Sequence, residues 1–184
     1  MLNETFKQLI SNYILAKDTN RPWHMQHAFE ADAVLEMELL TSNIEFPAHV
    51  EGRQAISETL VSNFGKTFEN VYTFCLEDSV DQSASLLTCD WLVFMTDKEG
   101  TGLKAGWGTY EWRFSGSENG ALTQRLKIKI EQMEILPLAL VDAVYRQVTE
   151  LSYPWTTASA VADKIAAINA LSDLSAYLNR ATWS

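Results

Sequence analysis

The chain has 184 residues, of which 47% are hydrophobic and 21% are charged, and this balance is typical of a globular domain with a substantial core. Its formal net charge is −10, and an acidic surface argues against binding to nucleic acids or anionic membranes, which requires clustered Lys and Arg. No stretch approaches the roughly 20 apolar residues of a membrane span, and no secretory signal pattern is visible, so we expect a cytoplasmic protein.

The first 65 residues predict three helices and two strands. Apolar residues between Phe6 and Ile14 recur at the helical period, and Asn3 suits the N-cap of that helix. A strand follows where Leu35, Met37 and other apolar residues alternate with glutamates. The expected helices cover 4–17, 23–29 and 52–65, and the expected strands cover 33–40 and 43–46, with Gly65 closing the third helix.

The middle of the chain predicts strands in hairpin succession. Two long runs rich in β-branched and aromatic residues flank the polar segment 96–102, which contains two glycines and indicates a hairpin turn. The four expected strands cover 71–77, 86–95, 103–114 and 122–135. Most of the expected helices precede most of the expected strands in this part of the chain. This order indicates an α+β fold, with helices on one face of an antiparallel sheet.

The last part of the chain, after Pro137, returns to a helical pattern. Apolar stripes over 140–148 and 161–178 predict two further helices, separated at Pro154. Two interpretations remain open for this segment. It either covers exposed surface of the same domain, or it serves as a dimerisation element or lid.

The order of elements resembles that of the nuclear transport factor 2-like superfamily, which includes SnoaL-like and ketosteroid-isomerase-like proteins. The resemblance rests on the opening amphipathic helix, the segment 28–34 that leads into the first strand, the helix start at 52–56 and the late meander of strands. It covers roughly 4–137. It implies a cone-shaped, cystatin-like α+β barrel, in which a strongly curved antiparallel sheet wraps around the N-terminal helices and encloses a cavity.

We therefore expect a cone domain over 1–137 and a C-terminal helical extension over 138–184, packed on the same domain or on a dimer partner. The extension departs from the family, whose members usually end near the last strand. Members include isomerases, dehydratases, hydrolases and non-catalytic binding modules, so the fold does not settle the function.

Strand alternation assigns side chains to the two faces of the sheet. A turn centred near Glu99 and Gly100 places Asp90 beside Tyr110, and the next turn places Tyr110 and Trp112 beside Leu126 and Ile128. A slip of one residue in the 96–102 turn would reverse the assignment of one strand. The expected ligand-binding residues of the concave face are Tyr72, Phe74, Trp112 and Ile128, together with Tyr13 from the first helix.

In this register Asp90 is the one carboxylate among the aromatic residues of the cavity. Burial disfavours the charged form of a carboxyl group and raises its pKa. A protonated acid can donate a hydrogen bond to an oxyanion, and an ionised one can act as a general base, so the candidate catalytic residues are Asp90, Tyr110 and His27. Two other interpretations are that Asp90 only hydrogen-bonds Tyr72, Tyr110 or Tyr13, or that it turns outward into a dimer interface.

Two backbone features of the sheet need an explanation. Gly106 and Gly108 either make room for a ligand or permit a sharp bend. The last strand changes phase, because its apolar residues are even-numbered up to Ile130 and odd-numbered from Met133. A bulge near Glu131 would produce this switch.

Histidines and cysteines form no recognisable motif. His24 and His27, with Glu36 or Glu38, could mimic a metal site, but nothing in the sequence fixes that geometry, so we expect no metal and no cofactor. Cys75 and Cys89 are expected to be free thiols that lie side by side on the convex face.

The sequence supports three hypotheses about function. The first is a homodimeric protein that binds a small apolar or aromatic molecule in an aromatic-lined pocket. The second is an isomerase, dehydratase or hydrolase that uses Asp90 as general acid or base. The third is a non-catalytic protein-interaction module. Whether the protein is an enzyme stays open at this point.

Overall fold

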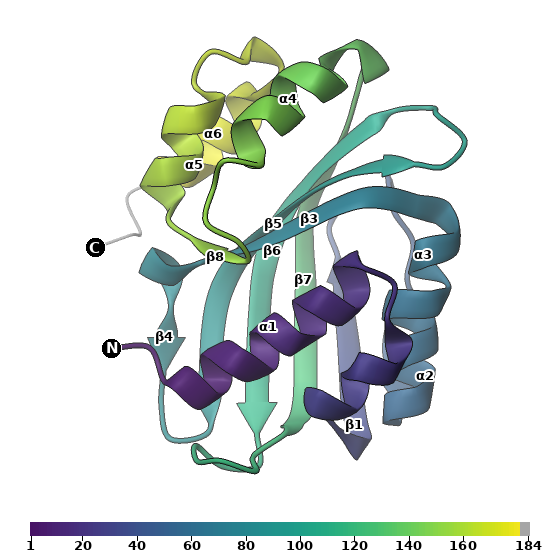
Figure 1. The fold of residues 1–184 in the computed structure, drawn as a ribbon, viewed down its shortest axis with the longest axis vertical. Coiled ribbons are helices and arrows are strands. Elements are labelled where there is room, and N and C mark those ends of the chain that lie inside the picture. Colours follow the sequence, from purple (N-terminus) through teal and green to yellow (C-terminus); the bar gives the residue numbers. More distant parts are fainter. Residues whose placement is uncertain (181–184) are drawn as a thin grey trace.

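The computed structural model describes residues 1–180 (Figure 1). Helix α1 (Glu4–Asp18) begins after Asn3, whose side-chain oxygen accepts hydrogen bonds from the backbone N–H groups of Thr5 and Phe6. The other helical elements of the N-terminal half are the 3-10 helix η1 (Pro22–His27), α2 (Arg53–Ser57), the π-helical turn η2 (Glu58–Ser62) and α3 (Phe64–Thr67). The expected third helix is therefore divided, and Gly65 lies inside α3 rather than at its end.

One curved sheet carries the eight strands of the described chain. They are β1 (Phe29–Leu39), β2 (His49–Glu51), β3 (Phe68–Leu76), β4 (Asp81–Gln82), β5 (Leu86–Asp97), β6 (Leu103–Phe114), β7 (Thr123–Leu136) and β8 (Trp155–Thr156). The strand order is β2-β1-β7-β6-β5-β3-β8, and β4 pairs with β5. The structure thus confirms the α+β class and the curved sheet. The sheet is mixed, because β1 runs parallel to β7 and β8 runs parallel to β3.

The second strand lies later than expected. Strand β2 pairs with β1 through Val50 opposite Leu35, whereas residues 43–46 belong to a loop. In that loop Ile44 is 8% exposed and packs in the core inside the sheet. The apolar residues that suggested a strand over 43–46 are thus buried by a loop.

Two hydrophobic cores lie on opposite faces of the sheet. The concave core contains α1 and the odd-numbered β5 residues Trp91 and Val93, and the convex core contains the even-numbered Leu92 and Phe94. The convex core is completed by α4 (Val141–Val148), α5 (Ala158–Ile165) and α6 (Ser172–Leu178). The short 3-10 helices η4 (Leu138–Leu140) and η5 (Asn169–Leu171) lie next to them in sequence, whereas η3 (Glu77–Ser79) follows β3. Figure 1 shows these C-terminal helices together at one end of the sheet, away from α1.

The C-terminal segment therefore packs on the sheet of its own chain. The buried residues of α4, α5 and α6 include Val144, Val161 and Leu174, each fully buried. Where two helices were expected, three form, because η5 separates α5 from α6. This packing corresponds to the first of the two interpretations of the segment.

The bulge in the last strand is confirmed. Trp107 opposes Gln132 while Gly108 opposes Ile130, so Glu131 is the extra residue of β7. A Cβ atom on Gly108 would lie 1.8 Å from the Lys129 carbonyl oxygen. The backbone of β7 thus fills the space beside Gly108, which supports the bend and not a ligand site.

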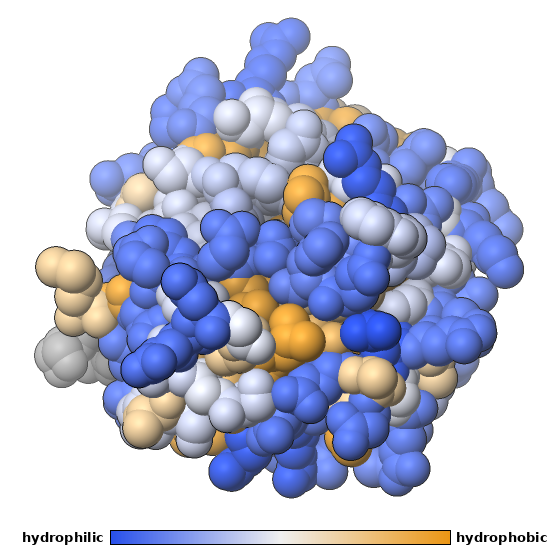
Figure 2. Space-filling view, turned by 60° about the horizontal axis from the view of Figure 1, so that its bottom comes forward, coloured by the Kyte–Doolittle hydropathy of each residue, from blue (hydrophilic) through white to orange (hydrophobic). Residues whose placement is uncertain are grey.

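The face of the molecule drawn in Figure 2 is largely hydrophilic, with an apolar area near its centre. Among residues 1–180, no helix is both long and apolar enough to cross a bilayer.

Candidate functional site

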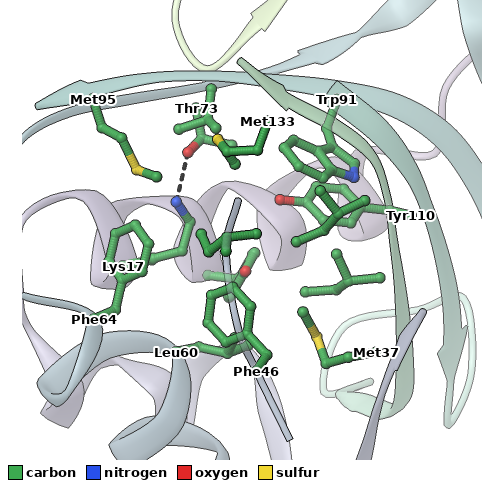
Figure 3. Close-up of a pocket in the computed structure, with 15 residues that line it drawn as sticks. Lys17, Met37, Phe46, Leu60, Phe64, Thr73, Trp91, Met95, Tyr110 and Met133 are labelled. Atoms are coloured by element: carbon green, nitrogen blue, oxygen red, sulfur yellow. Dashed lines mark hydrogen bonds between the residues drawn. The ribbon is translucent and has the colours of Figure 1, made fainter. Parts of the chain in front are cut away.

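A small cavity lies between α1 and the concave face of the sheet (Figure 3). The space open to the centre of a water molecule is about 40 Å³, which exceeds the ~10–15 Å³ that one water requires. Most of the side chains that line it are aliphatic, aromatic or thioether groups. The residues that carry the argument below are Tyr13 and Lys17 of α1, Thr73 of β3, Trp91 and Val93 of β5, and Tyr110 of β6, with Phe46 and Phe64 on the side of the loop and helices.

Strand and helix periodicity explain why these side chains meet. Tyr13 and Lys17 are four residues apart and therefore lie on one face of α1. Trp91 and Val93 are two residues apart on β5 and therefore lie on one face of the sheet. Tyr110 joins them from β6, because Cys89 and Tyr110 are opposite each other in the β5–β6 ladder.

The charged residue that lines the cavity, Lys17, belongs to a buried ion pair with its neighbour Asp18. Lys17 Nζ lies 2.9 Å from Asp18 Oδ1, and the two side chains are 7% and 2% exposed. Lys17 also donates a 2.6 Å hydrogen bond to the Thr73 hydroxyl, drawn in Figure 3. A buried pair of this kind keeps its charges only where further hydrogen bonds satisfy both groups.

The carboxylate of Asp18 is fully engaged. The Thr73 hydroxyl donates to Oδ1 at 2.9 Å, and the Thr73 backbone N–H donates to Oδ2 at 2.7 Å. The Tyr153 hydroxyl, from the segment before β8, donates to Oδ2 at 2.7 Å. Burial and the adjacent Asp18 charge raise the pKa of Tyr153, so this hydroxyl stays protonated and acts as a donor. The ion pair therefore joins α1, β3 and the C-terminal segment.

The ammonium group of Lys17 retains capacity for a ligand. It carries three donors, of which Asp18 and Thr73 take two. Its Nζ also lies 4.9 Å from the centroid of the Phe64 ring, a cation–π distance. One N–H group thus remains for an acceptor placed in the cavity that Lys17 lines.

An aromatic wall faces the ion pair. The rings of Trp91 and Tyr110 stack with centroids 5.4 Å apart, and Tyr13 meets Tyr110 edge to face at 6.1 Å. Burial raises the pKa of both tyrosines, so both hydroxyls are protonated at neutral pH. The Trp91 Nε1 atom is buried without a hydrogen-bond partner among the described residues. This wall offers hydrogen-bond donors and apolar surface.

Several predicted site residues occupy the expected place. Tyr13, Tyr110 and Ile128 line the cavity. Trp112 is fully buried behind it and contacts Tyr13 at a centroid distance of 5.4 Å. The expected pairing of Tyr110 with Ile128 is confirmed, because the two residues are directly opposite each other in the β6–β7 ladder.

The predicted position of Asp90 in the cavity is wrong. Asp90 opposes Thr109, not Tyr110, because the ladder is centred between Glu99 and Gly100, and a turn centred there pairs residue 90 with residue 109. The Asp97 side chain fixes this turn, since its Oδ1 accepts a 2.9 Å hydrogen bond from the Thr101 backbone N–H. A shift of one residue moves every side chain of the strand to the other face.

The expected position of Tyr72 and Phe74 in the cavity is also wrong, because both residues lie on the same face of the sheet as Asp90. Phe74 is fully buried in the convex core, and Tyr72 packs against that core. The ring of Phe74 contacts Tyr153 at a centroid distance of 5.7 Å. These two residues support the C-terminal helices and do not line the cavity.

Asp90 instead anchors α6 to the convex face of the sheet. The Tyr177 hydroxyl donates a 2.6 Å hydrogen bond to Asp90 Oδ2, and Arg180 forms an ion pair with the same oxygen. The Arg180 guanidinium also lies over the Tyr177 ring, 3.9 Å from its centroid. Asp90 is 7% exposed and bonds a tyrosine, but that residue is Tyr177 of the C-terminal segment and not one of the three tyrosines expected from the sequence.

His27 lies away from the cavity, at the end of η1. It is exposed, and its ring contacts those of Trp23 and His24 at 5.2 and 5.0 Å. Glu36 and Glu38 form ion pairs with Arg125 and Lys127 across β1 and β7. Within residues 1–180, no group of three or more His, Cys, Asp or Glu side chains is placed to hold a metal ion.

The two cysteines belong to the concave core, not to the convex face. Both are free and buried, and Cys75 opposes Trp91 rather than Cys89. Burial and the neighbouring Cys89 thiol raise the pKa of Cys75 well above its usual value, so this thiol is not activated as a nucleophile.

Lys17 is the site residue that sequence reasoning missed. A lysine at the end of an amphipathic helix is typical of a solvated helix terminus, and only its spacing of four from Tyr13 indicated the buried face. Thr73, the partner of Lys17, is opposite Val93 in the β3–β5 ladder and lines the cavity with it.

No protein-family model and no curated protein sequence matches the chain. Solved structures do resemble it. LinA matches with a TM-score of 0.58 and 14% identity over 72% of this chain and 88% of that protein. A ketosteroid isomerase-like protein from Catenulispora acidiphila, in complex with trimethylamine, matches with a TM-score of 0.53 and 15% identity over 66% and 83% of the two chains.

A nuclear transport factor 2-like superfamily protein from Salmonella enterica also matches, with a TM-score of 0.51 and 15% identity over 69% of this chain and 92% of that one. At these identities the likeness concerns the fold. The curved sheet around α1 and these matches together show that the chain has the nuclear transport factor 2-like fold.

Proposed function

We propose that this protein binds a small, neutral, mostly apolar molecule that carries one hydrogen-bond acceptor. The observation that carries the proposal is the buried Lys17–Asp18 pair in an otherwise apolar cavity. Ligand sites combine apolar walls with a few placed polar groups, and Lys17 supplies such a group.

The charge of the ligand follows from the charge of the site. Asp18 already neutralises Lys17 at 2.9 Å, so an anionic ligand would bring an uncompensated negative charge into an apolar enclosure. A neutral carbonyl oxygen can accept from Lys17 without this cost. Ketones, aldehydes and esters therefore fit better than carboxylates.

Catalysis that uses Asp90 as an acid or base no longer has a geometric basis, because Asp90 lies on the opposite face of the sheet from the cavity. The ionisable residues lining the cavity, within the described chain, are Tyr13, Lys17 and Tyr110. All three present hydrogen-bond donors, which supports binding of an acceptor.

Calorimetric titration with 2-pentanone and with pentanoate tests the proposal. The ketone should bind at least tenfold more tightly than the anion of similar size. Val93→Phe, which fills the cavity, should abolish ketone binding, whereas Ile135→Phe, at a 54% exposed position of β7, should leave it unchanged. Equal binding of both compounds, or ketone binding that survives Val93→Phe, would refute the proposal.

A further inference from the structure

We propose that the ligand site has a second chamber, an outer groove that joins the cavity between Phe46 and Phe64, and that the ligand is elongated and spans both. This inference rests on the proposed function and extends it to the length and polarity of the ligand. The outer groove lies between the loop before β2 and the segment formed by η2 and α3.

The groove and the cavity share a wall. The groove has a volume of about 250 Å³, and Phe46 and Phe64 line both it and the inner cavity. Pockets for small molecules usually hold roughly 300–1,000 Å³. The cavity of about 40 Å³ is too small for an elongated ligand, whereas the two chambers together approach the lower end of that range.

Phe64 is the movable part of the partition. Its ring packs against Phe68 at a centroid distance of 4.9 Å, and the Lys17 ammonium lies 4.9 Å from its centroid. It lies two residues after η2, a π-helical turn, and such turns are frequent at functional sites. Rotation of the Phe64 ring would open the partition and release the Lys17 ammonium from its cation–π contact.

The two chambers differ in polarity. The cavity wall is apolar apart from its donors, whereas the groove adds the polar side chains of Glu45, Thr59, Asn63 and Thr67 to its phenylalanines. Asn63 is exposed, and its amide can donate as well as accept. The ligand class that matches is a chain with an acceptor oxygen at the inner end, an apolar middle and a hydroxyl or similar polar group at the outer end.

A series of 2-alkanones from 2-pentanone to 2-undecanone tests the second chamber by calorimetry. In the wild-type protein the Kd should fall about fourfold per added methylene, the value expected for burial of each CH₂ group. Asn63→Trp, which blocks the groove, should raise the Kd of 2-undecanone at least tenfold and leave that of 2-pentanone within twofold. Thr67→Trp blocks the groove from α3 and should act in the same way.

The matched control is Gln54→Trp, an exposed amide on α2 that does not line the groove, and it should change neither Kd. If both blocking variants bind 2-undecanone as the wild type does, or weaken both ketones equally, the second chamber is refuted while the cavity stands. If the wild-type protein binds neither ketone, the proposed function itself fails. Circular dichroism confirms that each variant is folded.

Discussion

The Tyr177 hydroxyl donates a 2.6 Å hydrogen bond to Asp90 Oδ2, and this bond ties α6 to the centre of the convex face. It lies across the sheet from the Lys17–Asp18 pair, which lies under α1. The fold therefore carries two buried acids with separate tasks. Asp18 pairs with Lys17, the hydrogen-bond donor that lines the cavity, and Asp90 binds the C-terminal helix α6 to the sheet.

Tyr177→Phe should destabilise the protein without affecting the cavity. The substitution removes a hydrogen bond to a buried carboxylate, and such bonds contribute about 1.5–3 kcal/mol. Urea unfolding measures the loss. Tyr145→Phe is the control, because the Tyr145 hydroxyl bonds the neutral Asn70 carbonyl and should cost only about 0.5–1.5 kcal/mol. Weakened 2-pentanone binding in Tyr177→Phe would contradict the separation of the two tasks.

Lys17→Met should destabilise the protein strongly and abolish ketone binding. Removal of one partner of a buried ion pair leaves an uncompensated charge on Asp18, at a cost of about 3–5 kcal/mol. Urea unfolding and calorimetry measure the two effects.

The double variant Lys17→Met with Asp18→Asn should recover part of the lost stability but none of the binding, because it removes the stranded charge and still lacks the donor. A double variant less stable than Lys17→Met alone would show that the two charges are not coupled.

Stability should fall as the pH rises from about 4.5 to about 7. Burial, together with the hydrogen bond and charge of Asp173, raises the pKa of Glu134 from 4.5 to about 7. Within this window the unfolded state has lost its proton and the folded state keeps it, so each rise in pH favours unfolding. The stabilisation is complete below pH 4.5 and absent above about pH 7.

Glu134→Gln removes this titration, so its stability relative to the wild type should rise with pH by about 1 kcal/mol after solvent screening. Urea midpoints at pH 5 and pH 8 measure the difference. Identical pH profiles of the two proteins would show that Glu134 titrates normally.

Truncation after residue 137 should make the protein self-associate. The C-terminal helices cover Phe74, Leu92 and Phe94, and exposure of such an apolar face promotes association. Light scattering compares the mass of the truncated chain with that of the full chain, whose own mass tests the expected homodimer. A truncated chain with an unchanged association state would show that the helices do not protect this face.

The elements and the class of the fold could be predicted because they follow from local patterns. The stripe of α1, the bulge at Glu131 and the pairing of Tyr110 with Ile128 each depend on periodicity within one or two neighbouring segments. The parallel pairing of β1 with β7 is a contact between distant segments, and no local pattern contains it.

The site was only partly predictable, because its face assignment depended on one turn. The β5–β6 hairpin pairs Asp90 with Thr109 and not with Tyr110, and this difference of one residue exchanges Asp90 for Trp91 on the concave face. Lys17 could not be identified because its burial depends on Thr73, which meets Lys17 and Asp18 only in the folded structure.

The most direct test of the account is a crystal structure of the protein saturated with 2-pentanone. The account predicts electron density for the ketone in the cavity between Tyr13, Trp91 and Val93, with its oxygen within hydrogen-bonding distance of Lys17 Nζ. An empty cavity at saturating ketone, or a ketone bound only elsewhere on the protein, would contradict it.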